Sequence, residues 1–239
     1  MPNNVNELKV KIFSDGADLA TMLEMSRKSF IKGLTTNPTL MRKAGISDYK
    51  KFAKDVLKEI QDKPISFEVF SDDLEEMSRQ AIEIASWGSN VNVKIPATNS
   101  KGVETTQVIK ELSSRGVSLN ITAILTTKQV ENVVESLEID SEAFISVFAG
   151  RIADTGRDPI PLMEEALQIM KSKPKSQLIW ASPRELLNVF QADAIGCHVI
   201  TATSDILKKL DLIGKDLSQY SLETVRMFRD DAEASGYSI

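Results

Sequence analysis

The sequence predicts a closed (β/α)8 barrel of the α/β class, and three observations lead to this prediction. Short β-rich runs and amphipathic helical stretches alternate along the chain, and strict alternation predicts parallel strands joined by right-handed crossovers. Eight such units fit within 239 residues, a length at which α/β barrels routinely form one domain. The first strand-like run ends in Phe13-Ser14-Asp15-Gly16, which lacks the glycine-rich phosphate loop typical of a doubly wound open sheet.

The expected strands are short runs rich in β-branched and apolar residues. In chain order they lie at 8–15, 31–37, 65–70, 91–97, 118–125, 143–152, 177–182 and 198–202. Helical stretches, in which apolar residues recur at helical spacing, are expected between them at 18–28, 49–61, 74–87, 103–115, 127–137, 160–171 and 185–192. The whole chain, 1–239, is therefore interpreted as a single TIM-barrel domain.

A further stretch, 217–235, extends past the eighth unit. It carries Tyr220, Leu222, Val225 and Phe228 at helical spacing. We expect an extra C-terminal helix that packs across the barrel or reaches a neighbouring subunit.

Composition narrows the possible partners. A formal net charge of -5 and a pI near 5.2 argue against a nucleic-acid-binding surface, which needs a basic face. No N-terminal apolar run follows a basic start, and no apolar stretch of about 18 residues occurs, so we expect a soluble cytoplasmic protein with no membrane partner. A single cysteine, Cys197, and a single histidine, His198, exclude an intrachain disulfide and cysteine- or histidine-cluster metal sites. Both are interpreted as structural.

One lysine stands in an unusual context. Lys94 lies near the end of the run Val91-Asn92-Val93-Lys94-Ile95-Pro96-Ala97-Thr98, among apolar and β-branched residues. Burial disfavours the charged form of an amine and can lower its pKa by several units. A neutral amine attacks carbonyl groups and begins Schiff-base chemistry. The alternative is a strand lysine whose ammonium group reaches solvent.

Polar residues recur where the expected strands end, which is where barrel enzymes carry their chemistry. In chain order they are Asp15, Thr35-Thr36-Asn37-Pro38, Glu68, Lys94, Asn120, Thr122, Ser146, Arg151, Ser182 and Arg184. Each has an alternative interpretation, because polar residues at strand ends often serve turns and helix caps. Ser182-Pro183, for example, has the form of a helix start, and Arg151 could pair with Asp154. Together they predict an acid/base group, a carbonyl-capturing amine and an anion site in one pocket.

Five segments in this set resemble the transaldolase family, which includes the fructose 6-phosphate aldolases. They are Thr35-Thr36-Asn37-Pro38-Thr39, Val93-Lys94-Ile95-Pro96-Ala97-Thr98, Asn120-Ile121-Thr122, Ser146-Val147-Phe148-Ala149-Gly150-Arg151-Ile152 and Ala181-Ser182-Pro183-Arg184. The resemblance runs in order, at family spacing, over about 11–210. It implies a TIM barrel and, as in small relatives, a pentamer or decamer assembled through the C-terminal helix.

The resemblance also implies roles for individual residues. Lys94 would form the Schiff base, Glu68 would shuttle protons through a water held by Thr122, and Asp15 would act as the base in carbon–carbon cleavage. The substrate-binding residues implied are Thr36, Asn37, Asn120, Ser146, Arg151, Ser182 and Arg184, the last three lying around the phosphate. No metal and no cofactor are implied, because the iminium ion is the electron sink, and the partners implied are sugar phosphate substrates.

Two positions separate the relatives. Transaldolases proper place a glutamate on the third strand, as Glu68 here, whereas the aldolases carry a glutamine there and a tyrosine after the fifth-strand threonine, where this chain has Leu125. We therefore expect transfer of a dihydroxyacetone unit from sedoheptulose 7-phosphate or fructose 6-phosphate to an aldose phosphate. The alternatives are aldolase-type cleavage, a modified sugar substrate, suggested by the unusual segment 151–161 and by Pro183, and a catalytically silent barrel that binds sugar phosphates.

Overall fold

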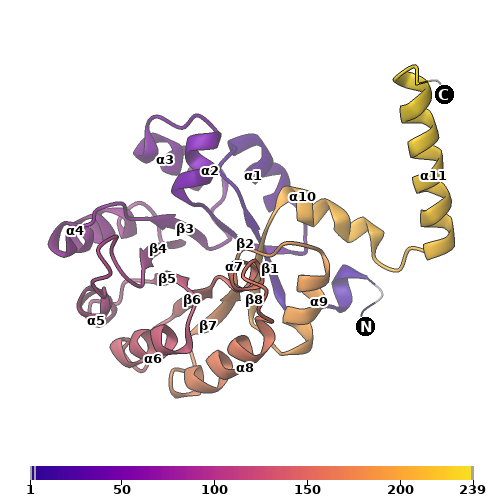
Figure 1. Ribbon diagram of the computed structural model, residues 1–239. Helices are drawn as coiled ribbons and strands as arrows, with labels where there is room; N and C mark the ends of the chain where they lie inside the picture. The colour runs from indigo at the N-terminus through magenta and orange to yellow at the C-terminus, as the bar shows by residue number, and fades with distance from the viewer. Residues whose placement is uncertain (1, 3, 238–239) are drawn as a thin grey trace.

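The structure is a computed structural model that describes residues 2 and 4–237. Within them, eight parallel strands pair in chain order, and β8 returns to pair with β1 (Figure 1). The strands are β1 (Lys11–Asp15), β2 (Ile31–Thr35), β3 (Ile65–Glu68), β4 (Val91–Pro96), β5 (Leu119–Ile124), β6 (Ala143–Val147), β7 (Gln177–Trp180) and β8 (Val199–Thr203). The predicted closed (β/α)8 barrel is confirmed.

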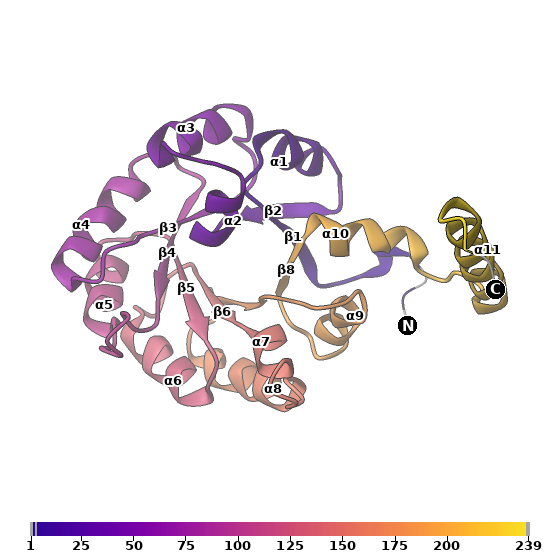
Figure 2. The same ribbon diagram turned by 45° about the horizontal axis from the view of Figure 1, so that its top comes forward.

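Helices surround the strands in both views (Figure 2). They are α1 (Leu19–Ser26), α2 (Pro38–Lys43), α3 (Tyr49–Glu59), α4 (Leu74–Ala85), α5 (Thr106–Ser114), α6 (Thr127–Ser136), α7 (Ala149–Ala153), α8 (Ile160–Ile169), α9 (Leu187–Ala194), α10 (Ser204–Leu207) and α11 (Leu217–Ala234). Several begin at a side chain that accepts a hydrogen bond from the backbone amide three residues on, among them Asp18, Asn37, Asp48, Asp73, Thr126 and Asp216. Such caps satisfy amides that have no partner within the helix.

Two apolar cores hold the barrel together. The larger lies between the strands and the surrounding helices. The smaller lies inside the barrel, where Phe13, Phe144, Ile179, Ala181 and Val199 pack together. The rings of Phe13 and Phe144 meet edge to face with centroids 5.5 Å apart.

A glycine in β2 makes room for the inner core. A Cβ atom on Gly33 would lie 2.5 Å from the ring of Phe13, closer than any packed side chain allows. The absence of a side chain at this strand position therefore lets the Phe13 ring lie directly against β2.

Three short helices near the carboxyl ends of strands were not expected from the sequence: α2, α7 and α10. The strand-like run 143–152 ends at Val147, and the chain then turns into α7. The strand prediction was wrong over this part because its apolar residues pack equally well as one turn of helix, a known ambiguity of short apolar runs.

The last helix, α11, stands apart from the barrel in both views. All of its residues are described, and none of them is buried. Large apolar side chains are exposed along it: Leu217, Tyr220, Leu222, Val225, Met227 and Phe228. Exposed apolar surface on this scale is typical of an interaction site.

Candidate active site

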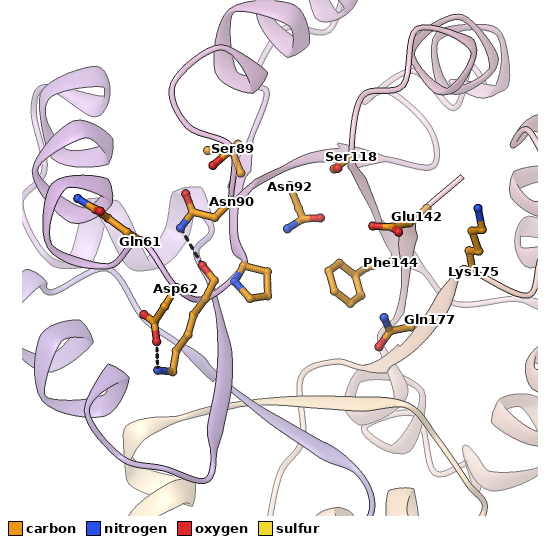
Figure 3. Close-up of a pocket in the computed structure, with 14 residues that line it drawn as sticks. Gln61, Asp62, Ser89, Asn90, Asn92, Ser118, Glu142, Phe144, Lys175 and Gln177 are labelled. Carbon is orange, nitrogen blue, oxygen red and sulfur yellow. Dashed lines mark hydrogen bonds and ion pairs between the residues drawn. The ribbon is translucent and has the colours of Figure 1, made fainter. Parts of the chain in front are cut away.

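The barrel is hollow at both ends, and the two hollows differ in chemistry. The hollow at the amino ends of the strands, about 510 Å³, contains the amide of Asn92 and the ring of Phe144 (Figure 3). Two lysines at its rim, Lys63 and Lys175, are paired with surface aspartates at 3.0 Å. The hollow at the carboxyl ends, about 650 Å³, contains the lysine and both carboxylates that the sequence analysis singled out. The second hollow is the candidate active site.

Lys94 occupies the floor of this cavity. β4 lies between β3 and β5, so that Lys94 is in register with Glu68 on one side and Asn120 on the other. Its Nζ atom lies 3.2 Å from Glu68 Oε2 and donates a hydrogen bond to the carbonyl oxygen of Thr36 at 2.9 Å. The residue is only 6% exposed. Its amine is therefore buried, as the apolar context of Lys94 predicted.

Thr36 contributes through its backbone. Its hydroxyl donates to the carbonyl oxygen of Ser66 at 2.9 Å, and the residue is fully buried. The side chain therefore does not line the cavity. What Thr36 presents to the site is the carbonyl oxygen that holds the Lys94 amine.

Asp15 ends β1 and faces Lys94 across the cavity. Thr35 Oγ1 donates to Asp15 Oδ1 at 2.7 Å, and Asn37 Nδ2 donates to Oδ2 at 3.3 Å. Burial raises the pKa of Asp15 above that of an exposed aspartate, while the charge of Lys94 and these two hydrogen bonds oppose the rise. A carboxylate with its pKa shifted towards neutrality is suited to general base chemistry.

Asn37 has a fixed orientation because it also caps a helix. Its Oδ1 atom accepts from the amide of Leu40 at 3.0 Å at the start of α2, whose first residue is Pro38. The side-chain oxygen is thereby committed to the helix, and the NH2 group is turned towards Asp15. The Asn-Pro pair thus builds a helix start and a carboxylate contact together.

Asn120 joins the inner walls of three strands. Its Nδ2 donates to Ser66 Oγ at 2.9 Å, and its Oδ1 accepts from Ser146 Oγ at 2.7 Å. All three residues are buried. The second amide hydrogen of Asn120 makes no hydrogen bond to the described residues, 2 and 4–237.

Thr122 lies beside an irregularity in β5. The pairing of β5 with β6 shifts register between Ile121 and Ile124, and Ala123 adopts the left-handed conformation at φ 60°. The Thr122 hydroxyl is buried, lines the cavity and makes no hydrogen bond to any residue within 2 and 4–237. A polar atom of this kind is free to bind water or substrate.

The residues predicted to bind an anion lie at the rim, on the segments after β6 and β7. Ser182 adopts φ 60°, and its carbonyl oxygen lies so close to α7 that a Cβ atom on Gly150 would be 1.5 Å away. Arg184 donates from Nε to Asp154 Oδ1 at 2.9 Å and from Nη2 to Oδ2. The guanidinium of Arg151 lies 5.6 Å from the ring centre of Phe148.

The aspartate at position 154 therefore pairs with Arg184, not with Arg151 as one interpretation of the sequence proposed. Arg184 holds the pKa of Asp154 below its usual range. Arg151, Ser182 and Arg184 all line the cavity, so the structure brings the three predicted anion-binding residues to one rim.

One residue of the cavity, Thr201, was not predicted from the sequence. Thr35 and Thr201 both line the cavity, and their hydroxyl oxygens lie 2.6 Å apart. The alternation of threonine and apolar residues at the end of β8 indicates an inward-facing row, but only the closed barrel brings Thr201 of this row to Thr35, on the far side of β1.

Two further points concern the described part of the chain, residues 2 and 4–237. No helix in it is both long and apolar enough to cross a membrane. No group of three or more His, Cys, Asp or Glu in it is placed to hold a metal ion.

The chain is similar to known proteins along most of its length. Residues 12–239 match the family model described as transaldolase/fructose-6-phosphate aldolase. A probable transaldolase of Dehalococcoides mccartyi is 35% identical over 202 residues, which cover 84% of this chain and 90% of the relative. One from a Thermoanaerobacter species is 31% identical over 231 residues, covering 96% of this chain and all of the relative. The chain therefore belongs to the transaldolase/fructose-6-phosphate aldolase family.

Proposed function

We propose that this protein is a transaldolase that transfers a dihydroxyacetone unit between sugar phosphates through a Schiff base on Lys94. The observation that carries the proposal is the buried amine of Lys94, 3.2 Å from Glu68 and facing Asp15, at the floor of an open cavity. An amine, a proton shuttle and a base within one cavity are the groups that class I aldol chemistry needs.

The first half of the reaction forms the imine. The unprotonated Lys94 amine adds to the C2 carbonyl of a ketose phosphate and gives a carbinolamine. Glu68, acting through a water held by the free hydroxyl of Thr122, donates the proton with which the C2 oxygen leaves as water. The product is a protonated imine on Lys94.

The second half breaks and remakes a carbon–carbon bond. Asp15 takes the proton of the C4 hydroxyl, the C3–C4 bond breaks, and its electron pair moves into the iminium group to give an enamine. C4 becomes the carbonyl carbon of an aldehyde, which leaves. A second aldehyde then enters, and the same steps in reverse attach the three-carbon unit to it, so we expect ping-pong kinetics.

The other cavity residues would hold the sugar. Asn37 and the remaining amide hydrogen of Asn120 are placed for the hydroxyls of the three-carbon unit, with Ser146 supporting Asn120. Arg151, Ser182 and Arg184 at the rim would bind the terminal phosphate, whose oxygens suit the arginine fork. Thr36 would act through its carbonyl oxygen.

Transfer is favoured over simple cleavage. Glu68 and Leu125 stand where the resemblance to aldolases implies glutamine and tyrosine. A donor–acceptor pair of the non-oxidative pentose phosphate pathway in the cytoplasm is therefore proposed, with sedoheptulose 7-phosphate or fructose 6-phosphate as donor. Release of free dihydroxyacetone from fructose 6-phosphate without an acceptor aldehyde would instead support the cleavage activity.

The experiment that tests the proposal is trapping of the imine. The protein is incubated with fructose 6-phosphate and sodium borohydride, and its peptides are analysed by mass spectrometry. We expect a reduced three-carbon adduct on Lys94, which requires both imine formation and C3–C4 cleavage.

Two variants serve as controls. Lys94→Met is expected to abolish the adduct. Lys101→Met is expected to leave it unchanged, because Lys101 lies in an exposed turn after β4. An adduct on Lys101, or retention of an adduct in the Lys94 variant, would contradict the proposal.

We also propose that the chain assembles into a homo-oligomer through α11. The exposed apolar side chains of this helix support the proposal, and the family resemblance implies a pentamer or a decamer.

A further inference from the structure

Two buried threonines lie beneath Asp15 inside the barrel. Asp15 is in register with Thr35 of β2 on one side, and Phe13, two residues earlier in β1, is in register with Thr201 of β8 on the other. The two threonine side chains meet across β1, with 2.6 Å between their oxygens. Thr35 is 3% exposed and Thr201 is 7% exposed, so bulk water competes little for these hydroxyls.

Thr201, Thr35 and Asp15 form a series of two hydrogen bonds, called the hydroxyl chain, and counting the available hydrogens shows which way these bonds run. An ionised carboxylate only accepts hydrogen bonds, and a hydroxyl has a single hydrogen to donate. The hydrogen of Thr35 is used on Asp15 Oδ1 at 2.7 Å. The hydrogen between the two threonines must therefore belong to Thr201. The order is Thr201 to Thr35 to Asp15, with both donors directed towards the carboxylate.

The apolar surroundings strengthen the hydrogen bonds of the hydroxyl chain. The ring of Phe13 lies in the inner core below it, in the space that Gly33 leaves open. Hydrogen bonds in a weakly polarisable environment are stronger than in water, and consecutive ones polarise each other. Donation from Thr201 therefore strengthens donation from Thr35.

We propose that Thr201 is a positioning residue for the base of the reaction, acting on Asp15 through the hydroxyl of Thr35. The inference rests on the proposed function, in which Asp15 takes a proton from the substrate. The hydroxyl chain holds Oδ1 from below and Asn37 holds Oδ2, so the carboxylate is fixed while lone pairs on both oxygens remain for the substrate.

Other charged groups also act on Asp15. Lys94 of β4 and Glu68 of β3 face it directly, and their effects on its pKa are opposite in sign. Asp205 of α10 lines the same cavity, as do Arg151 and Arg184 at the rim. The neighbouring Asp18 is turned away, because it caps α1 through Thr21. Replacing Thr201 leaves all of these groups in place, so a change in titration reports on the hydroxyl chain.

The first test needs no substrate. The titration of the Asp15 side-chain carboxyl is followed by carbon-13 NMR in the wild type, in Thr201→Val and in Thr201→Ser. Valine has the shape of threonine without the hydroxyl, and serine keeps the hydroxyl. We expect the valine variant to titrate roughly 0.3 to 0.5 pH units higher, because the bond from Thr35 to Asp15 remains and only its strengthening by Thr201 is lost. The serine variant is expected to match the wild type.

The second test uses the reaction. The acid limb of the pH profile of kcat/KM is expected to move up by the same interval in Thr201→Val, so that activity below the limb falls roughly two- to threefold. KM at high pH is expected to stay unchanged. Trapping of dihydroxyacetone itself on Lys94 with borohydride is also expected to stay unchanged, because it involves no cleavage and shows that the pocket is folded.

The outcomes are distinct. A valine variant whose carboxyl titration and acid limb both coincide with those of the wild type overturns the inference. A loss of activity that is equal at every pH also overturns it, because it indicates a packing role alone. A wild type that forms no adduct with any ketose phosphate overturns the proposed function, and the NMR titration then still decides whether Thr201 acts on Asp15.

Discussion

The single histidine of the chain has a defined structural partner. Nδ1 of His198 accepts a hydrogen bond from the backbone amide of Leu178 in β7 at 3.0 Å. The ring must therefore carry its hydrogen on Nε2 and be neutral, since a protonated ring has no acceptor. Partial burial and the charge of Lys11 lower the pKa of His198, which agrees with the neutral form.

This contact predicts a pH dependence of stability. Because the pKa of His198 is lower in the folded state, the unfolded chain binds more protons below the ordinary histidine pKa of about 6.5. We expect the free energy of unfolding to fall as the pH decreases through 6.5 towards the folded-state pKa. Thermal denaturation between pH 7.5 and 5 measures this effect.

His198→Asn is the matched control, because its side-chain oxygen stands near the position of Nδ1 and does not titrate. The variant is expected to lose less stability than the wild type over the same pH range, since the carboxylates are common to both. Parallel curves would show that His198 contributes nothing to the acid sensitivity.

At the same scale, the residues that sequence reasoning found differ in kind from those that it missed. Lys94 was recognisable because a charge among apolar neighbours is unusual, and Glu68 and Asp15 because they end strands. Thr201 carries no such signal, and Thr35, although it ends a strand, gives no indication of a contact with Thr201. Their contact depends on the closure of the barrel between β8 and β1, which no local pattern specifies.

Among the elements, α7 and the segment after β7 make a close backbone contact. Ser182, in a left-handed conformation that is costly for a residue with a side chain, places its carbonyl oxygen against Gly150. The arrangement brings Arg151 of α7 to the same rim as Arg184. The position of these two arginines at one rim thus depends on a close backbone contact between two elements.

Gly150→Ala is expected to be strongly destabilising. The new Cβ atom would lie 1.5 Å from a backbone oxygen, a clash that no side-chain rotation relieves, so we expect a loss of about 3 kcal/mol or more in the free energy of unfolding. Gly156→Ala is the control: it has a positive φ of 78° but no atom within 4 Å, and should cost about 1 kcal/mol. Thermal denaturation compares the two, and equal losses would refute the steric argument.

The sequence predicted the strands better than it predicted the short helices. All eight strands were placed from β-rich runs bounded by turns, but three short helices after strands escaped prediction. One of them, α2, begins at Pro38 directly after Asn37, and an asparagine cap followed by proline favours a helix start. α7 was missed because Phe148 and Ile152 extend an apolar run beyond the strand, and the end of β6 is set by packing against the segment at Ser182.

For the whole molecule, α11 is the part that the barrel does not explain. None of the residues of α11 is buried. A helix that packs against nothing is only marginally stable in water. Val225 and Phe228 are 60% and 62% exposed. A second copy of the chain would supply the apolar surface that this helix lacks.

Light scattering of the purified protein is therefore expected to give a mass five or ten times that of the 26.4 kDa chain. The double variant Val225→Asp and Phe228→Asp is expected to reduce this mass towards that of a single chain. Arg226→Ala, on the same helix, should retain the assembly. A wild type that stays monomeric at micromolar concentration would contradict the proposed oligomer.

The pairing of β8 with β1 has a consequence for synthesis of the chain. Asp15 is synthesised near the start of the chain. Thr201, which donates a hydrogen bond to Thr35, the partner of Asp15, is synthesised almost two hundred positions later. Contacts between segments so distant in sequence form late in folding. A growing polypeptide thus carries Lys94 and Glu68 well before Asp15 is held in place, and the proposed activity would arise only when the ring of strands has closed.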